Sequence, residues 1–341
     1  MLRLSILAAA IVVIVAGAAM LHSGPTAPTA SVSISYRSLP DDVIVVIQAD
    51  VQALVEAEVF RSLSDRFGEN PLSDNAKYRE FVEATGFRFE TDLKSVTIGV
   101  GGDLADDSPP FYVLVDGNFD RKKVDAYLLN SGEYERDELD GMAAYVPKGA
   151  ADSQGISATL AWLDDDTLVA SSSPDFGKLV RSIDGRAPNV ADSVLGRLLG
   201  GADGQIQLAM ILPEAEEPEQ DDASPPSMVR SIVESVRDSP LARLDSILVT
   251  LDAGSGLDLT VQAEADTPES STAVYEMLNG YLAMGRMMAA ENPQLGIVLD
   301  HFELERNEAV VKLGVSMTGD EIRAAIEESQ PEAAVAEPDG S

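Results

Sequence analysis

Apolar residues recur along this chain with two periods, and the periods predict alternating strands and helices. A continuous apolar run at residues 43–49 is typical of a buried strand, and apolar residues then recur at helical spacing up to residue 67. Asp50 is placed to cap that helix, and Asp120 is placed to cap a later one. Further helices are predicted near residues 77–84 and 175–183, and further strands at 95–100, 111–116, 157–163 and 168–171, with two short strands around a turn at 140–141.

The second half of the chain repeats this order of elements. Residues 259–265 alternate between apolar and polar, which is typical of a strand with one buried face. A long helix opens at Pro268, and Thr318 with Glu321 forms a capping box that starts the last helix. The other predicted elements are strands at 205–212, 246–251, 302–305 and 311–317 and a helix at 228–236.

This repeated order predicts an α+β fold: an N-terminal signal or anchor helix, then a duplicated body of antiparallel sheet plus helices. Hairpins and one-sided alternation favour antiparallel strands over a doubly wound parallel sheet. The predicted repeats are residues 38–200 and 201–328, and coincidence among common α+β orders is the alternative to duplication. Residues 213–226 hold four prolines and six carboxylates, which predicts an exposed acidic loop, and residues 329–341 read as a disordered tail.

The N-terminus has the organisation of an export signal. Residues 1–21 contain a basic Arg3 near the start and continue as an uncharged apolar run at residues 4–21. As a helix with a rise of 1.5 Å per residue, this run spans roughly 27 Å, close to the ~30 Å core of a bilayer. The segment is therefore predicted either to remain as a single transmembrane anchor or to be cleaved as a signal peptide. A tether at residues 22–37 follows. The body is expected outside the cytoplasm, periplasmic and attached to the cell membrane in the first case and secreted in the second.

Charge and cysteine usage narrow the function classes. The chain carries 58 acidic and 24 basic residues, a net charge of −34, so nucleic acids are excluded as expected partners. It has no cysteine, which excludes disulfides and thiolate chemistry. The acidity fits either a surface that binds cations or a basic partner, or the general solvation of a protein from a saline environment.

Short segments of the chain resemble a known group of proteins. The Leu-Pro-Asp-Asp lead at residues 39–42 feeds an apolar strand that ends at Asp50, and Thr-Gly-Phe at 85–87 and Asp-Leu at 92–93 precede the next strand. This pattern resembles a loose group of anchored, exported bacterial proteins of unknown function. The resemblance covers residues 38–328. It implies the extracytoplasmic address and the fold class, and it brings no catalytic residues.

Motifs for catalysis are missing from the sequence. Of the two histidines, His301 precedes a strand whose Phe302 and Leu304 are expected to face the core, so His301 is expected at the surface. No Gly-x-Ser-x-Gly elbow or Ser-x-x-Lys pair accompanies it. No cofactor is predicted.

Two acidic turns are candidate metal sites. Asp103, Asp106 and Asp107 form one turn and Asp164, Asp165 and Asp166 the other, and carboxylate oxygens are the ligands that Ca²⁺ prefers. A hydrated turn without metal is the alternative, because so many carboxylates make local clusters inevitable.

Methionine gathers on one side of the long helix. Met277, Met284, Met287 and Met288 are flexible apolar side chains that fit an apolar groove, and core packing is the alternative.

The sequence therefore predicts a non-catalytic extracytoplasmic binding or scaffold protein, attached to the membrane through its N-terminal segment, whose partner is an unknown protein or apolar ligand. The alternatives are a carboxylate-dependent hydrolase and a periplasmic chaperone or carrier with a Met-lined groove.

Overall fold

The structure, a computed structural model, describes residues 35–59, 76–102, 109–148, 158–173, 175–212, 239–289 and 293–328. Several predicted features lie outside these residues: the anchor or signal at 1–21, the acidic turn at 103–107, the loop at 213–226, the helix at 228–236 and the tail at 329–341. Within the described part, no helix is both long and apolar enough to cross a bilayer.

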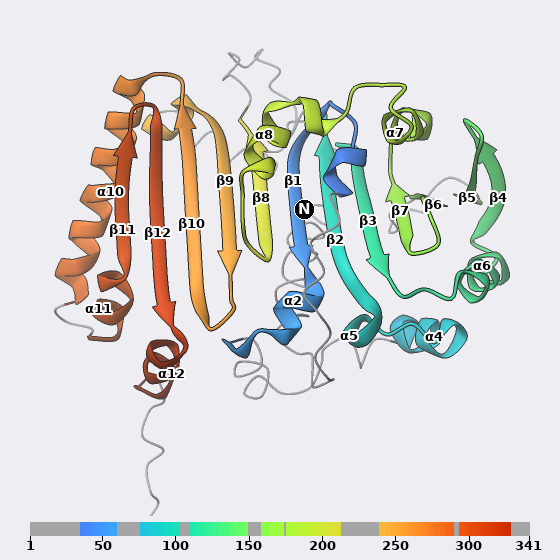
Figure 1. Ribbon diagram of the computed structural model, residues 1–341, viewed down its shortest axis with the longest axis horizontal. Helices are drawn as coiled ribbons and strands as arrows, with labels where there is room; N and C mark the ends of the chain where they lie inside the picture. The colour runs from blue at the N-terminus through green and yellow to red at the C-terminus, as the bar shows by residue number, and fades with distance from the viewer. Residues whose placement is uncertain are drawn as a thin grey trace, which may run out of the picture.

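A twelve-stranded sheet runs through the described residues (Figure 1). Its order is β11-β12-β10-β9-β8-β1-β2-β3-β7-β6-β5-β4, and every neighbouring pair is antiparallel. The strands are β1 (Val43–Asp50), β2 (Leu93–Gly101), β3 (Phe111–Gly117), β4 (Tyr134–Leu139), β5 (Met142–Pro147), β6 (Thr159–Trp162), β7 (Thr167–Ser171), β8 (Ile206–Ile211), β9 (Leu244–Asp252), β10 (Gly256–Ala265), β11 (Phe302–Asn307) and β12 (Val310–Thr318).

The helices are η1 (Ser35–Ser38), α2 (Val51–Glu56), α4 (Ala76–Thr85), α5 (Phe89–Asp92), α6 (Arg121–Asn130), α7 (Phe176–Ile183), η2 (Val190–Asp192), α8 (Val194–Gly200), η3 (Pro240–Arg243), α10 (Pro268–Ala289), α11 (Pro293–Asp300) and α12 (Gly319–Glu328). Sequence reasoning missed α5, α8 and α11, which are short, and α8 and α11 also contain glycine, a poor helix former. The capping predictions are confirmed. Asp50 accepts a hydrogen bond from the Ala53 amide at 2.8 Å, and Thr318 and Glu321 bond each other reciprocally.

The α+β fold with an antiparallel sheet is confirmed by this architecture. Counted outward from the centre, one half has the order β1-β2-β3-β7-β6 and the other has β8-β9-β10-β12-β11, with the hairpin β4–β5 added to the first half. The halves join through antiparallel β1 and β8, with Ile47 opposite Leu208. Both halves therefore belong to one continuous sheet. The matching order is what a duplication would leave, and the duplication itself stays a prediction for superposition to test.

Each face of the sheet has its own core. On one face, Val46, Leu114 and Val169 lie under η1, α7, η2 and α8, and none of the three is more than 1% exposed. On the opposite face, α6 packs on Trp162 at one end of the sheet and α10 packs on Ala263 at the other. The helices thus cover both faces of the first half, while in the second half α10 covers one face.

The folded part begins earlier than the predicted end of the tether at residue 37. Tyr36 lies in the short helix η1 and is only 6% exposed. Leu39 is fully buried, and its carbonyl accepts a hydrogen bond from the Val190 amide at 2.9 Å. The tether prediction relied on composition, whereas Tyr36 is ordered by core residues that come more than a hundred positions later in the chain.

Candidate functional surface

The outer side of the C-terminal half of α10 is an exposed apolar surface. The helix lies at the margin of the molecule, beyond β11 (Figure 1). The side chains of Tyr281, Met284, Met287 and Met288 are 60%, 54%, 76% and 60% exposed, so they fill no core. Met277 is half-buried, and Val298 of α11 is also exposed. These six residues are called the methionine surface below.

A second apolar stripe of α10 holds the helix against the protein. Val274 is buried, and it packs with Leu278 against Ala263 of β10 and Val311 of β12. Further along, Gly285 faces α11, and a Cβ at this position would lie 3.2 Å from Leu299 Cδ1. The absence of a side chain at Gly285 thus lets α11 approach closely. Because one stripe already binds the body, the outward stripe at residues 277, 281, 284 and 288 is unnecessary for attaching the helix.

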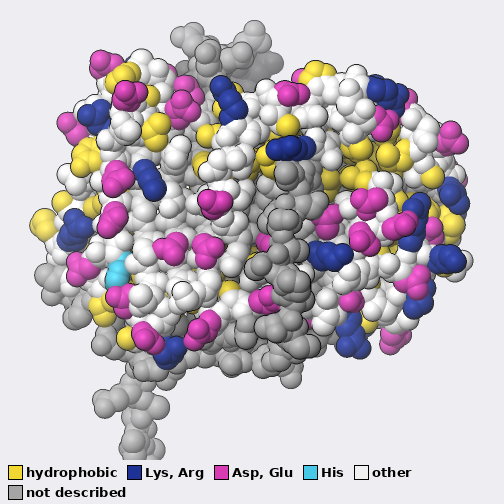
Figure 2. Space-filling model, viewed as in Figure 1, with side chains coloured by type: hydrophobic (Ala, Val, Ile, Leu, Met, Phe, Trp, Pro, Cys, Tyr) yellow, Lys and Arg dark blue, Asp and Glu magenta, His cyan; other side chains and the backbone are white. Residues whose placement is uncertain are grey.

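The methionine surface also differs from the rest of the chain in charge. Residues 277–290 include no carboxylate, although the chain as a whole contains 58, and Arg286 is their single charged residue. Figure 2 shows hydrophobic side chains among the charged ones at the margin formed by α10. An apolar patch bounded by polar residues is typical of a binding surface. Both alternatives for the methionines, a groove lining and a filled core, differ from this open position.

The three predicted calcium ligands at the β6–β7 turn have other contacts. Asp164 accepts hydrogen bonds from the amides of Asp166 and Thr167, at 2.8 and 2.7 Å. Asp165 pairs with Arg121 at 3.3 Å, and Asp166 pairs with Lys94 at 3.4 Å. No cluster of three or more metal-binding side chains occurs in the described ranges. Calcium binding remains a prediction, and Asp103, Asp106 and Asp107 lie outside those ranges.

A polar groove of about 280 Å³ lies on the sheet near His301. Its lining includes Asp258 of β10, Glu303 of β11, and Lys312 and Gly314 of the intervening strand β12. His301 Nε2 lies 3.7 Å from Glu321 Oε1, so the ring faces the capping box of α12. Hydrogen bonds from the Thr318 amide and hydroxyl hold the pKa of Glu321 below its usual value. The groove joins carboxylates to a lysine at the open surface of a sheet, and no observation assigns it a ligand.

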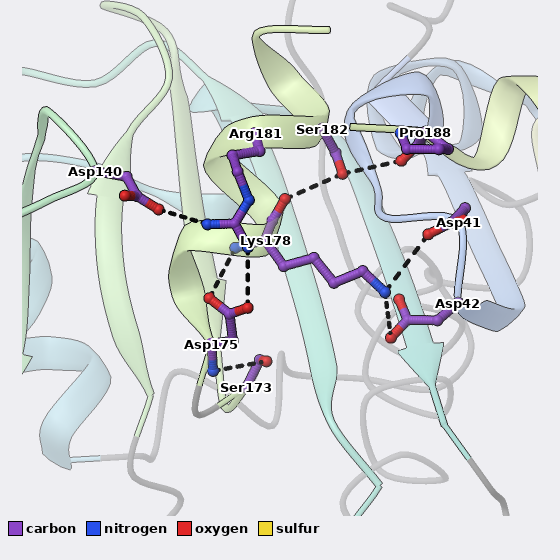
Figure 3. Close-up of polar contacts among 9 residues, drawn as sticks. All are labelled: Asp41, Asp42, Asp140, Ser173, Asp175, Lys178, Arg181, Ser182 and Pro188. Atoms are coloured by element: carbon purple, nitrogen blue, oxygen red, sulfur yellow. Dashed lines mark hydrogen bonds and ion pairs between the residues drawn. The ribbon is translucent and has the colours of Figure 1, made fainter. Parts of the chain in front are cut away.

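A network of ion pairs ties the start of β1 to α7 (Figure 3). Lys178 Nζ lies 3.5 Å from an Asp41 oxygen and 2.8 Å from an Asp42 oxygen. Burial by itself would lower the pKa of Lys178. The two carboxylates have the larger combined effect in the opposite direction, so the pKa of Lys178 lies above its usual value. Arg181 extends the network to Asp140 at 2.9 Å.

The contacts of this network indicate a structural role. Asp41 and Asp42 belong to the Leu-Pro-Asp-Asp lead, whose leucine is buried in the core shared with α7, η2 and α8 and whose carboxylates bind Lys178 of α7. Sequence reasoning placed the lead before a strand, and it had no signal for the partner on α7, which lies far along the chain. The lead therefore holds the chain against α7 at the point where β1 begins.

No family model matches the chain, and no curated protein matches it. Among solved structures, crystal form III of TP0453 is similar with a TM-score of 0.46 and 7% identity, covering 86% of this chain and 97% of that one. Crystal form I of TP0453 gives 0.45 and 9%, covering 88% and 98%, and form IV gives 0.42 and 9%, covering 86% and 96%. Similarity at this level carries no conclusion about function.

Proposed function

We propose that this chain is a non-catalytic binding or scaffold protein of the bacterial envelope, with its body outside the cytoplasm and its N-terminal segment as the attachment to the membrane. The observation that carries the proposal is the methionine surface. More than half of each of four large apolar side chains is exposed on one helix, in a chain whose net charge is −34. A surface of this kind is costly to leave in water unless it is covered part of the time.

The remainder of the fold supports the role of a rigid platform. In the part of the chain that the structure describes, twelve strands form one sheet, and α10 is fixed to it by Val274 and by the close approach of α11 at Gly285. The outward stripe is therefore presented on a regular element rather than on a loop, which favours binding with little loss of conformational entropy. A carrier for apolar molecules would use the same surface and remains the second candidate.

The address is tested by cysteine accessibility, because the chain has no native cysteine. A full-length Glu138→Cys variant, changed at an exposed position of β4, is treated with a membrane-impermeant maleimide in intact spheroplasts. We expect labelling before lysis. A Leu2→Cys variant is the matched control, and it should react only after lysis if the N-terminal segment is retained as an anchor. Labelling of Glu138→Cys only after lysis would exclude an extracytoplasmic body.

Binding is tested by photocrosslinking in cells. A photoreactive amino acid at position 287 should give a crosslinked product, whether to protein or to lipid, and the same residue at position 138 should give none. Both positions are exposed, so they differ in the chemistry of their surroundings rather than in access. Equal yields at both positions, or no product at either, would contradict a binding role for α10.

A further inference from the structure

We propose that the methionine surface docks reversibly on the lipid surface of the membrane that holds the N-terminal segment, so that the body has a second point of attachment. This inference rests on the proposed extracytoplasmic, tethered body. It adds what the surface binds: the interfacial region of a bilayer with mainly zwitterionic headgroups.

The geometry of α10 suits a helix that lies in the plane of a membrane surface. Met277, Tyr281, Met284 and Met288 follow one another at intervals of four, three and four residues, which places them on one line along the helix. Val298 of α11 extends the apolar area beside this line. Helices that rest on bilayers bury such a face at the boundary of headgroups and acyl chains. Methionine fits this disordered boundary because its side chain is flexible and apolar.

The charge pattern selects the kind of lipid surface. A chain with a net charge of −34 is repelled by anionic lipids. The methionine surface is a local exception because residues 277–290 contain no carboxylate. Arg286 is exposed and lies outside the line of apolar side chains, where its guanidinium can reach lipid phosphates while the methionines enter the interface. Tyr281 is also suited to the interface, because it has an apolar ring and a polar tip.

A second copy of the chain fits the surface less well. The exposed apolar area of these side chains is on the order of 500 Å², whereas a stable dimer buries about 800 Å² on each partner. Two strongly acidic bodies would also repel each other during association. A membrane has no such area requirement when another anchor already holds the protein beside it.

The tether explains how a small surface can suffice. Residues 22–34 lie between the predicted anchor and the folded part, and when fully extended they span at most about 45 Å. The body thus stays close to the bilayer, and docking becomes an intramolecular step with an effective concentration of about millimolar. The attachment through α10 can then be weak and reversible.

The test uses the full-length chain in proteoliposomes of phosphatidylcholine. An environment-sensitive fluorophore is attached to Met287→Cys in one sample and to Glu138→Cys in another, and nitroxide-labelled lipids serve as quenchers. We expect a blue shift and at least twofold stronger quenching at position 287 than at 138. Adding Met284→Glu and Met288→Glu to the Met287→Cys chain should remove the difference, while Trp162 fluorescence and circular dichroism show that the fold is retained.

The other results each overturn the proposal in a recognisable way. Energy transfer between chains that disappears on dilution in lipid would identify a second copy as the occupant. A blue shift without lipid quenching would mean that another segment of the same chain covers the surface. Equal quenching at both positions would exclude docking through α10, and the proposed function would still stand if the Glu138→Cys labelling in spheroplasts had succeeded.

Replacing 30% of the lipid by phosphatidylglycerol should weaken the quenching at low salt and restore it at high salt. Stronger quenching at low salt would contradict the selection of zwitterionic lipid.

Discussion

The buried carboxylate of Asp116 should be a main support of the first half of the sheet. Asp116 lies on β3 and is 8% exposed, directly opposite Ser95 of β2 and Thr167 of β7. The Ser95 hydroxyl donates to one carboxylate oxygen at 2.5 Å, and the Thr167 hydroxyl donates to the other at 2.6 Å. One side chain therefore links three strands through two hydrogen bonds to a charged acceptor.

The expected cost of Asp116→Ala follows from these contacts. Each hydrogen bond to a charged group contributes about 1.5–3 kcal/mol, and the desolvation of the carboxylate offsets part of the sum. The loss is felt through the hydroxyls of Ser95 and Thr167, which remain buried without their acceptor, and it is smaller if either hydroxyl finds another partner. We expect a loss of about 2–4 kcal/mol in the free energy of unfolding. Asp116→Asn should lose about 1–2 kcal/mol, because the amide still accepts one hydroxyl and can donate to the other.

Urea denaturation followed by the fluorescence of Trp162, the single tryptophan of the chain, measures this loss. Trp162 is buried on β6 beside β7, so its emission reports on the same half of the sheet. Ser95→Ala and the double variant complete a mutant cycle, in which the two costs should add up to more than the cost of the double variant. A cost below about 0.5 kcal/mol for Asp116→Ala would show that desolvation cancels the hydrogen bonds, and the reasoning would be wrong.

Three further predictions concern packing, pH and salt. Gly196→Ala should destabilise the fold by about 1–3 kcal/mol, because the added Cβ would lie 2.3 Å from the Val190 carbonyl oxygen. The control is Gly280→Ala, whose Cβ meets no atom within 4 Å, and it should be neutral or stabilising. Thermal unfolding measures both effects. Burial and the hydrogen bond with Asp125 raise the pKa of Tyr145 to about 12, so the stability that Tyr145 contributes is complete below pH 10 and is lost as the pH rises through about 12. Ultraviolet titration should show this late phenol, and the loss should be absent in Tyr145→Phe. The thermal midpoint should rise between low salt and 1 M NaCl through screening of the net charge, and CaCl₂ at matched ionic strength should act equally. A larger effect at sub-millimolar Ca²⁺ would instead indicate a specific site at the acidic turns.

Sequence reasoning was least able to place the methionine surface. The sequence predicts a groove lining or a filled core for the methionines of α10, and the structure places Met284, Met287 and Met288 in the open. Helical periodicity shows that apolar residues share a side of the helix, but it contains no information about which side meets the sheet. In the structure the stripe with Val274 packs inward, and the stripe with Met284 faces outward. The cause lies in β10 and β12, whose alanine and valine side chains fit one stripe.

The acidic turn at residues 164–166 is a second case in which contacts depend on residues distant in the chain. The turn at residues 164–166 could be read as a calcium site because acidic residues are adjacent in sequence. The structure brings Arg121 and Lys94, both more than forty residues away, against Asp165 and Asp166. Local sequence reveals the ligands that an ion could use, but the competing cations come from other elements of the fold.

What the sequence determined by itself is therefore local: the positions of the main strands and helices, the caps at Asp50 and Thr318, and the antiparallel α+β class. Hydrogen bonds and side-chain periods within a few residues decide these features. Only the tertiary structure decided that β1 pairs with β8 to make one sheet, that Lys178 binds the lead at Asp42, and that the methionine surface is exposed. Each of these depends on contacts between residues distant in the chain, which form where shape, burial and charge agree across the whole molecule.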